Sequence, residues 1–359
     1  MSNVTHELSA DQYLVTHEVG PNQHGVRLDN FLKERYRRRS REMLKRAIES
    51  GVILVQREQG PHVSLGRLKS STCLLPGDQV LVVSDRKPEP AVDFNYKVLF
   101  EDDVLFVIEK PANLPVHPAG RYFFHTLLIH LKTNGHKDPL RLEREYYLVH
   151  RIDKETSGIL VLTTDRDAAT HITRQFFERK TEKSYLAIVR GITHQEFTVE
   201  LPIRRAKKSA ISLKMEAVTG DTAGEDVMTA STRFERLDTA GDFSLVACYP
   251  KTGRQHQIRV HLDSAGHPIV GDKLYGMPEE EALRFFERQH LSPEAEAKLL
   301  LPRHALHSAG LAFTHPVTER RIEFRSDLPA DLRAFFERQR VQTLDTRLPP
   351  VSFPTLSPS

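Results

Sequence analysis

A polar turn followed at once by an apolar run is the feature that most constrains this chain. Residues 150–158 read HRIDKETSG, and residues 159–162 that follow read ILVL. The apolar run predicts a buried strand, and the turn before it carries one carboxylate, Asp153. Turns that a rigid scaffold holds are common positions for chemistry. Taken alone, Asp153 fits a nucleophile, a general base, a metal ligand or an ordinary turn residue.

The length of 359 residues predicts about two domains with sizeable cores. No apolar run approaches the ~20 residues that cross a bilayer, and the first residues lack the apolar segment of a signal peptide. We therefore expect no membrane association. The two cysteines, Cys73 and Cys248, are too few for a disulfide framework or a thiolate metal cage. These observations indicate a cytoplasmic protein, with a monomer as the default oligomeric state.

Changes in patterning along the chain predict its organisation. Residues 27–49 have helical spacing, and residues 52–55 and 80–83 are β-rich, which indicates a compact α/β module. The expected parts are a loose tail (1–20), this small module (21–84), a linker with two prolines (85–91), a larger domain (92–340) and a proline-rich C-terminal tail (341–359).

The larger region is rich in strand patterns with interspersed helices. The expected strands are residues 104–108, 184–189, 243–248 and 310–313. An amphipathic helix is predicted over residues 165–179. The Thr-x-x-Gln pattern of residues 252–255 predicts a capping box, with a helix from there to Ser264. The charged residues 278–300 predict a helical surface insertion.

Basic residues are concentrated locally on a chain whose net charge is only +3. Eight of the fourteen residues from Lys33 to Arg46 are Lys or Arg, and residues 204–208 read RRAKK. Such clusters indicate a surface that binds a polyanion. A solvated helix face fits either cluster equally well when it is taken alone.

Two further segments differ from ordinary scaffold. Residues 182–191 read EKSYLAIVRG, with Tyr185 near the start of a predicted strand. Residues 252–262 read TGRQHQIRVHL, and residues 266–272 read GHPIVGD. Arg259 lies beside the apolar face of the predicted helix, and a half-buried arginine needs an anionic partner. Asp153 is the candidate for that partner.

These three motifs, in this order, resemble those of the RluA family of RNA pseudouridine synthases over roughly residues 98–326. Residues 26–83 are similar to an S4 RNA-binding domain, although residues 56–60 read QREQG where that family often has an Asn-Gly turn. The resemblance implies an α+β fold, with a pseudouridine synthase catalytic domain built on a mainly antiparallel central sheet. A small S4-like α/β module would precede it.

The resemblance also implies a cofactor-free isomerisation of uridine in RNA, in which the C1′–N1 bond breaks and C1′ rejoins the base through C5. Breaking a glycosidic bond builds positive charge on the sugar, which a carboxylate stabilises or traps. Asp153 would be the nucleophile, and Arg259 would keep it ionised. Tyr185 would stack on the uracil and could assist in removing the C5 proton. Whether Asp153 attacks C1′ directly or first helps to remove a ribose proton stays open.

RNA contacts are expected in both regions of the chain. Because the target base must leave its stack, Arg151 is expected to occupy the vacated space, as the family's arginine does. Arg254 and His256 are expected near a helix N-terminus, where phosphate binds well. The remaining expected RNA-binding residues belong to the first basic cluster: Arg38, Arg41 and Lys45.

Three alternatives remain at this stage. Large-subunit ribosomal RNA is the commonest target of relatives with an S4 domain, but residues 114–122 (LPVHPAGRY) resemble a branch that includes transfer-RNA-modifying enzymes. A metal hydrolase would need the histidines, of which only His304 and His307 have a helical ligand spacing. A non-catalytic RNA-binding or ribosome-assembly protein is the alternative of another class. We expect RNA as the partner, and neither a metal nor a cofactor.

Overall fold

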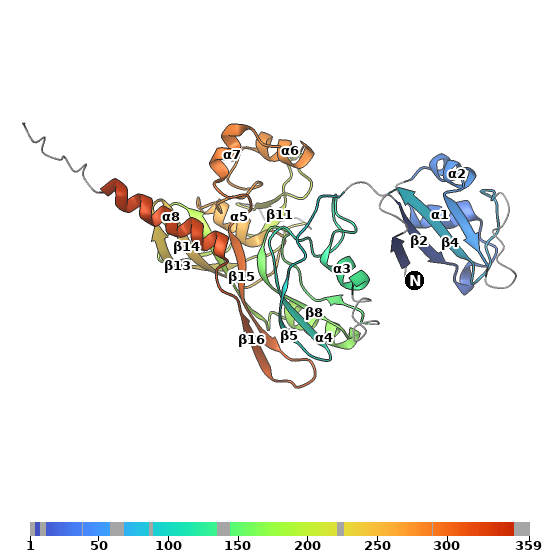
Figure 1. The fold of residues 1–359 in the computed structure, drawn as a ribbon, viewed down its shortest axis with the longest axis horizontal. Coiled ribbons are helices and arrows are strands. Elements are labelled where there is room, and N and C mark those ends of the chain that lie inside the picture. The colour runs from blue at the N-terminus through green and yellow to red at the C-terminus, as the bar shows by residue number, and fades with distance from the viewer. Residues whose placement is uncertain are drawn as a thin grey trace, which may run out of the picture. The chain divides into compact units, whose positions relative to one another are not determined.

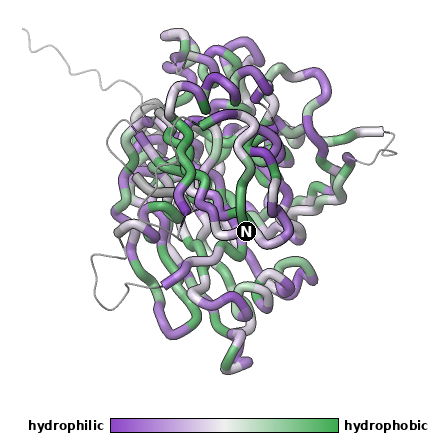
Figure 2. The backbone as a smooth tube through the Cα atoms, turned by 90° about the vertical axis from the view of Figure 1, so that its right-hand side faces the viewer, coloured by the Kyte–Doolittle hydropathy of each residue, from purple (hydrophilic) through white to green (hydrophobic). Residues whose placement is uncertain are grey.

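The computed structural model describes residues 4–7, 12–37, 39–57, 68–85, 89–134, 144–220, 226–288 and 290–347. The chain forms two compact units, Met1–Glu89 and Pro90–Ser359 (Figure 1). Hydrophobic and hydrophilic segments alternate along the backbone (Figure 2). Each unit has a hydrophobic core of its own.

The first unit is a four-stranded antiparallel sheet with two helices. Its sheet has the order β1-β2-β4-β3. Its elements are β1 (Val4–Glu7), β2 (Gln12–Glu18), the 3-10 helix η1 (Pro21–Gln23), α1 (Leu28–Arg35), α2 (Arg41–Glu49), β3 (Ile53–Gln56) and β4 (Gln79–Asp85). Ser40 caps α2 by accepting a hydrogen bond from the Met43 amide. The apolar faces of both helices pack on Val80 and Val82 of β4.

The structure corrects the expectation of a loose tail over residues 1–20. Strand β2 pairs with β4 along its whole length, from Gln12 to Glu18. The most buried residue of β2 is His17, which is 3% exposed and hydrogen-bonds the Tyr36 hydroxyl at 2.8 Å. Because the inward-facing residue is a histidine, the strand has no apolar alternation that sequence reasoning could detect.

The second unit is built on a ten-stranded sheet. The strand order is β10-β13-β14-β9-β15-β8-β6-β5, with β16 paired to β15 and β7 paired to β8. Its strands are β5 (Lys97–Glu101), β6 (Leu105–Lys110), β7 (Tyr147–Leu148), β8 (Ser157–Thr163), β9 (Glu182–Arg190), β10 (Glu196–Val199), β13 (Thr232–Ala240), β14 (Phe243–Pro250), β15 (Leu306–Thr314) and β16 (Arg321–Arg325). Together with the helices, this arrangement confirms the predicted α+β class with a mainly antiparallel sheet.

Helices cover both faces of this sheet (Figure 1). On β6 and β8, alternate residues pack either against α3 (Leu127–Asn134) or against α4 (Arg166–Phe177). The rest of the sheet packs against α5 (Gln257–Ser264) and α8 (Ala330–Arg347). A separate lobe combines the hairpin of β11 (Ile203–Arg205) and β12 (Met215–Ala217) with α6 (Glu279–Arg288) and α7 (Pro293–Leu299).

One parallel pairing, between β15 and β8, joins the strands β10-β13-β14-β9-β15 of the large sheet to the strands β8-β6-β5. Among the strand pairs of the described residues, β15 and β8 alone run parallel, with Ser308 opposite Gly158. Gly158 has a φ of +107°, and a Cβ atom there would lie 2.2 Å from the Ser308 carbonyl oxygen. Only glycine fits this position. The turn that contains Asp153 therefore ends at a junction where the backbones approach unusually closely.

Two further boundaries differ from the expected ones. Helix α5 begins at Gln257, because Gln257 turns its side-chain oxygen back to accept hydrogen bonds from Thr252 Oγ1 and the Arg254 amide. The Thr-x-x-Gln pattern thus belongs to the loop before the helix and is not a capping box. Helix α8 continues to Arg347, beyond the expected domain end at residue 340, and residues 348–359 lie outside the described part of the chain.

Candidate active site

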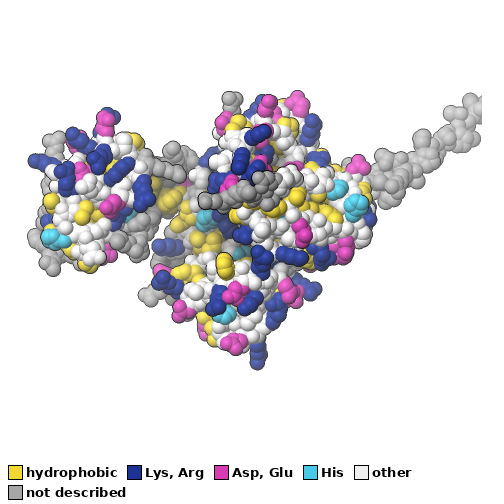
Figure 3. Space-filling view, turned by 180° about the vertical axis from the view of Figure 1, so that it is seen from behind, with side chains coloured by type: hydrophobic (Ala, Val, Ile, Leu, Met, Phe, Trp, Pro, Cys, Tyr) yellow, Lys and Arg dark blue, Asp and Glu magenta, His cyan; other side chains and the backbone are white. Residues whose placement is uncertain are grey.

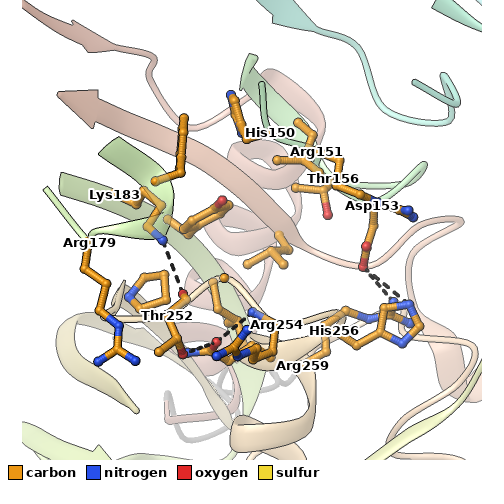
Figure 4. Close-up of a pocket in the computed structure, with 18 of the residues that line it drawn as sticks. His150, Arg151, Asp153, Thr156, Arg179, Lys183, Thr252, Arg254, His256 and Arg259 are labelled. Carbon is orange, nitrogen blue, oxygen red and sulfur yellow. Dashed lines mark hydrogen bonds and ion pairs between the residues drawn. The ribbon is translucent and has the colours of Figure 1, made fainter. Parts of the chain in front are cut away.

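Asp153 lies in the loop that leads into β8, and it is paired with Arg259 of α5. Arg259 Nη1 donates to Asp153 Oδ2 at 2.8 Å, across 106 residues of sequence. The Nε and Nη2 atoms of the same guanidinium donate to the two oxygens of Asp272, at 2.7 and 2.8 Å. Asp272 is itself held by the amides of Leu274 and Tyr275. Asp272 therefore fixes Arg259 from behind. The donor that remains is directed at Asp153 (Figure 4).

The electrostatic surroundings keep Asp153 ionised. Burial by itself would raise the pKa of Asp153, but its neighbours His256, Arg259 and His304, together with the Arg259 hydrogen bond, lower it to about 2. Burial lowers the pKa of His256 to about 4 and that of His304 well below its usual value. Both imidazoles are thus neutral at pH 7. The permanent charge that holds Asp153 as a carboxylate is that of Arg259.

Tyr185 lies on β9 and lines the same pocket as Asp153. Its hydroxyl is hydrogen-bonded to the Ser308 side chain, and burial raises the pKa of the phenol to about 12. The phenol is therefore neutral at pH 7. Its ring packs between two core clusters of the large unit, which fixes the plane that it offers to a ligand.

A buried lysine fastens the Asp153 loop from below. Lys110, at the end of β6, is fully buried, and its ammonium donates to the carbonyls of Pro111, Leu114 and Lys154 at 2.8–3.0 Å. Burial lowers the pKa of Lys110 to about 7. The contact with Lys154 ties the residue directly after Asp153 to the central sheet.

Polar side chains brace the loop on its other side. Glu155 Oε1 accepts from Lys273 Nζ at 2.8 Å, and Glu155 Oε2 accepts from the His304 amide at 3.0 Å. Thr156 Oγ1 bonds the ring of His304 at 2.7 Å. Each polar residue that follows Asp153 thus has a specific partner, which explains why the loop needs this particular run of residue types.

A pocket of about 590 Å³ opens over Asp153, a size typical of small-molecule sites. Its walls come from the Asp153 loop, the end of α4, the start of β9 and the segment before α5. Figure 4 shows Asp153 and Arg151 on one side of this pocket and Lys183 and Arg179 on the other. The pocket combines apolar walls with several cations, which suits an anionic ligand that carries a flat ring.

The structure brings three of the expected RNA-binding residues to this pocket. Arg151 is exposed, and its Nη1 lies 3.2 Å from His117 Nε2. Arg254 also lines the pocket, and its Nε donates to the Thr229 carbonyl at 3.3 Å. The ring of His256 faces inward, with Nε2 3.9 Å from Asp153 Oδ2 and Nδ1 3.0 Å from the Tyr275 hydroxyl. His256 thus lies beside the carboxylate.

The other expected RNA-binding residues belong to the first unit. Arg41 and Lys45 are exposed on α2, and Lys45 Nζ lies 3.9 Å from Glu49. Lys and Arg side chains gather on the part of this unit that carries α2 (Figure 3). Arg38 lies outside the described residues.

Sequence reasoning assigned no role to several of the residues that build this site. Asp272 was visible as the last residue of the GHPIVGD motif, and a second acid near Arg259 was the available signal. Lys110 stands just after a predicted apolar strand, where a charged residue is exceptional if buried. His304 gave no usable signal, because its partners Thr156 and Glu155 lie about 150 residues away.

The histidine pair that suggested a metal site has other partners. His304 bonds Thr156, and His307 lies on β15 with its two ring nitrogens at 2.9 Å from Ser157 Oγ and 3.0 Å from Ser326 Oγ. Within the described ranges, no group of three or more His, Cys, Asp or Glu residues is arranged to hold a metal ion. None of the helices in those ranges is long and apolar enough to span a membrane.

Comparison with known proteins defines the class of this enzyme. Residues 104–264 match the family model described as RNA pseudouridylate synthase. A protein of Zymomonas mobilis named ribosomal large subunit pseudouridine synthase D is 32% identical over 317 residues, which cover 87% of this chain and 93% of the relative. An uncharacterized RNA pseudouridine synthase of Bacillus subtilis, YlyB, is 31% identical over 333 residues, covering 89% and 95%.

A solved structure supports the same class. The human RNA pseudouridylate synthase domain containing 1 protein superimposes with a TM-score of 0.53 and 26% identity, over 73% of this chain and 100% of that chain. The chain belongs to the RluA family of RNA pseudouridine synthases. It is therefore an enzyme that isomerises uridine in RNA.

Proposed function

We propose that this enzyme converts specific uridines of large-subunit ribosomal RNA to pseudouridine in the cytoplasm, with Asp153 as the nucleophile. The observation that carries the mechanism is the ionised Asp153 carboxylate, held by Arg259 in a pocket of about 590 Å³. The relatives from Zymomonas mobilis and Nitrosomonas europaea are named as large-subunit synthases, which supports the choice of RNA.

The reaction is balanced without an added reagent. The C1′–N1 bond breaks, the uracil turns over, a C1′–C5 bond forms, and the proton lost from C5 is matched by a proton gained at N1. No electrons enter or leave, so the chemistry itself requires no redox cofactor. Asp153 would stabilise or trap the cationic sugar, as carboxylates do in glycoside cleavage. Arg259 keeps the carboxylate charged and aims it.

Tyr185 would hold the detached uracil by ring contact. Its phenol is protonated at pH 7, so it could accept the C5 proton only while passing its own proton on. Arg151, exposed at the pocket mouth, would fill the gap that the extruded nucleotide leaves in the RNA.

Phosphate contacts would come from Arg254 beside the pocket and from the basic residues expected in the first unit, Arg38, Arg41 and Lys45. The fold of that unit, a small sheet with two helices, is compatible with the proposed S4-like role. Electrostatic binding of this kind weakens steeply with salt. RNA affinity that does not change between about 50 and 200 mM salt would refute the role of these cations.

The test is to incubate the pure protein with ribosomal and transfer RNA transcripts and to map pseudouridine at each position. We expect new pseudouridine in large-subunit RNA. Modification confined to transfer RNA would replace the substrate, and tight binding without any isomerisation would favour a non-catalytic RNA-binding protein. Asp153→Asn should keep RNA affinity and lose turnover, because the amide can neither trap nor stabilise the sugar cation. Substantial turnover by this variant would exclude Asp153 as the nucleophile.

A further inference from the structure

An exposed aromatic side chain stands at the rim of the catalytic pocket. Phe177, the last residue of α4, is 87% exposed and lines the pocket, whereas the adjacent Phe176 packs with its ring stacked on His150. The fold does not use the Phe177 ring, because the neighbouring phenylalanine already fills the core position. Aromatic faces exposed beside basic groups are typical stacking platforms for bases of single-stranded nucleic acid.

Two residues further on, Arg179 occupies a backbone conformation that favours glycine. Its φ is +58°, and the Lys180 amide bonds the Gln175 carbonyl in the helix-ending arrangement in which glycine is usual. The left-handed backbone conformation is strained for an arginine, because its Cβ atom lies too close to the backbone. In the part of the chain that the structure describes, the guanidinium of Arg179 has neither a hydrogen-bond nor an ion-pair partner. Strained residues cluster at functional sites, and this one lines the pocket.

Lys183 lies beside Arg179 and adds a second cation. Its ammonium donates to the Thr252 carbonyl at 3.3 Å, and burial together with the charge of Arg179 lowers the pKa of Lys183 to about 8. Two neighbouring cations repel each other unless an anion lies between them. Figure 4 shows both side chains across the pocket from Asp153.

A second groove, of about 830 Å³, begins where the catalytic pocket ends. Arg179, Lys183 and Pro250 line both, so the two cavities adjoin each other. Basic side chains outnumber acidic ones along this groove: Arg179, Lys183, Arg233, Lys251 and Arg325, against Glu182 and Glu323. The guanidinium of Arg233 lies over the Tyr249 ring, 4.1 Å from its centre, which provides a second flat cationic surface.

We infer that Phe177, Arg179 and Lys183, with the groove beyond them, bind the RNA nucleotide next to the target uridine. The base of that nucleotide stacks on Phe177, and its phosphate lies between Arg179 and Lys183. The chain then continues along the basic groove. This inference rests on the proposed function, because it takes the target uridine to occupy the pocket over Asp153.

Phe177→Ala tests the stacking contact. We expect the dissociation constant for substrate RNA to rise about 5- to 150-fold, which corresponds to the ~1–3 kcal/mol of one base–aromatic stack. Phe177→Trp should restore affinity. The matched control is Val317→Ala, which removes another exposed apolar side chain, 66% exposed, in the turn between β15 and β16. Equal affinities of Phe177→Ala and Val317→Ala would overturn the stacking contact.

Arg179→Gly separates a binding role from a structural one. Because glycine relieves the strain at φ +58°, we expect the melting temperature to stay the same or rise. RNA affinity should nevertheless fall, and the slope of log affinity against log salt should decrease by about one. A lower melting temperature with unchanged affinity would show that Arg179 is structural and would refute the phosphate site.

A set of RNAs, each with one abasic position next to the target, identifies the stacked base. With one of them, Phe177→Ala should cause no further loss of affinity, because the base that stacks is already missing. A loss that is equal in all of them contradicts the inference. Failure of the wild-type protein to form pseudouridine would remove the proposed function instead. Wild-type activity with variants that behave like Val317→Ala would remove only this subsite.

Discussion

Arg259 donates one hydrogen bond to Asp153 while both carboxylate oxygens of Asp272 hold its other edge. The guanidinium is only 8% exposed, and the Asp153 side chain is 23% exposed. This arrangement makes the negative charge of Asp153 depend on an arginine whose direction is fixed by a second, fully buried acid. Removing Arg259 should therefore change the protonation of Asp153, whereas removing Asp272 should change the orientation of Arg259.

Arg259→Gln should shift the acid limb of the pH–activity profile to higher pH. In the wild type the pKa of Asp153 is about 2, so its protonation does not limit the rate above pH 4. Without the charge of Arg259, burial raises the pKa of Asp153, and single-turnover rates should fall as the pH decreases from 7 to 5. Arg259→Lys, which keeps the charge but loses the two-pronged hold, should be slower at every pH without this shift. Identical acid limbs for the wild type and Arg259→Gln would contradict the assignment.

The lowered pKa of Asp153 also has a consequence for stability. The unfolded carboxyl has an ordinary pKa near 3.8, so the folded state binds fewer protons between pH 3.8 and about 2. The resulting stabilisation, about 2 kcal/mol, is complete above that window and is lost as the pH falls through it. Acid unfolding of Asp153→Asn should lack this component. A pH dependence of unfolding equal to that of the wild type would show that Asp153 is not held as a carboxylate.

Asp272→Asn should weaken both the fold and the site. It removes the charge that faces Arg259 inside the protein, and breaking a buried ion pair costs about 3–5 kcal/mol. The free energy of unfolding in urea should fall by about that amount, and kcat should fall because Arg259 loses its direction. Asp238→Asn is the control, since Asp238 pairs with Arg340 at the surface, where such pairs contribute about 0–1 kcal/mol. Equal losses in the two variants would mean that the buried pair has no special role.

The sequence predicted the pairing of Asp153 with Arg259, because a half-buried arginine needs an anionic partner and both residues lie in recognisable motifs. It could not predict the side chains that hold these two residues in place. The side chains that brace the Asp153 loop come from segments up to about 150 residues away, and their contacts depend on the parallel junction of β8 and β15. No periodic pattern encodes that junction. Gly158 was visible in the motif, but its reason, a carbonyl 2.2 Å from the missing Cβ, needs three-dimensional coordinates.

At two places a hydrogen bond of a polar side chain made a prediction from the sequence pattern wrong. The inward residue of β2 is His17, which hydrogen-bonds Tyr36, so a paired strand looked like a polar tail. The side chain of Gln257 folds back onto the loop before α5. The helix therefore begins at Gln257, after the Thr-x-x-Gln pattern of residues 252–255 that resembles a capping box. Both are cases in which a polar side chain takes a place that an apolar pattern or a backbone group usually fills.

Tyr185→Phe should separate ring contact from proton transfer. The ring remains, so substrate RNA still binds, while loss of the hydroxyl should lower kcat about 10²-fold or more. Tyr185→Leu should also raise KM, because the uracil loses its aromatic partner. Release of tritium from C5-labelled uridine in RNA measures the step directly. Tyr147→Phe removes a hydroxyl that bonds Glu145 at the surface and is the control. Unchanged tritium release by Tyr185→Phe would assign the proton transfer to another group.

Lys110→Met should release the Asp153 loop from the sheet. The ammonium has three donors and uses them on three carbonyl oxygens, including that of Lys154. Methionine fills the same space but leaves these carbonyls without a donor, at about 1–3 kcal/mol for each unsatisfied group, offset by the removal of a buried charge. We therefore expect a net loss of about 2 kcal/mol and a fall in kcat of more than tenfold, since Asp153 loses its fixed position.

The pH dependence of stability distinguishes this lysine from a surface one. Burial lowers the pKa of Lys110 from 10.5 to about 7, so between these values the unfolded chain binds more protons than the folded one. The free energy of unfolding should therefore rise with pH across that window, by at most ~1.4 kcal/mol per pH unit. Lys110→Met should lack this slope, whereas Lys97→Met, at an exposed position of β5, should keep it. Parallel curves for the wild type and Lys110→Met would show that the buried ammonium does not titrate there.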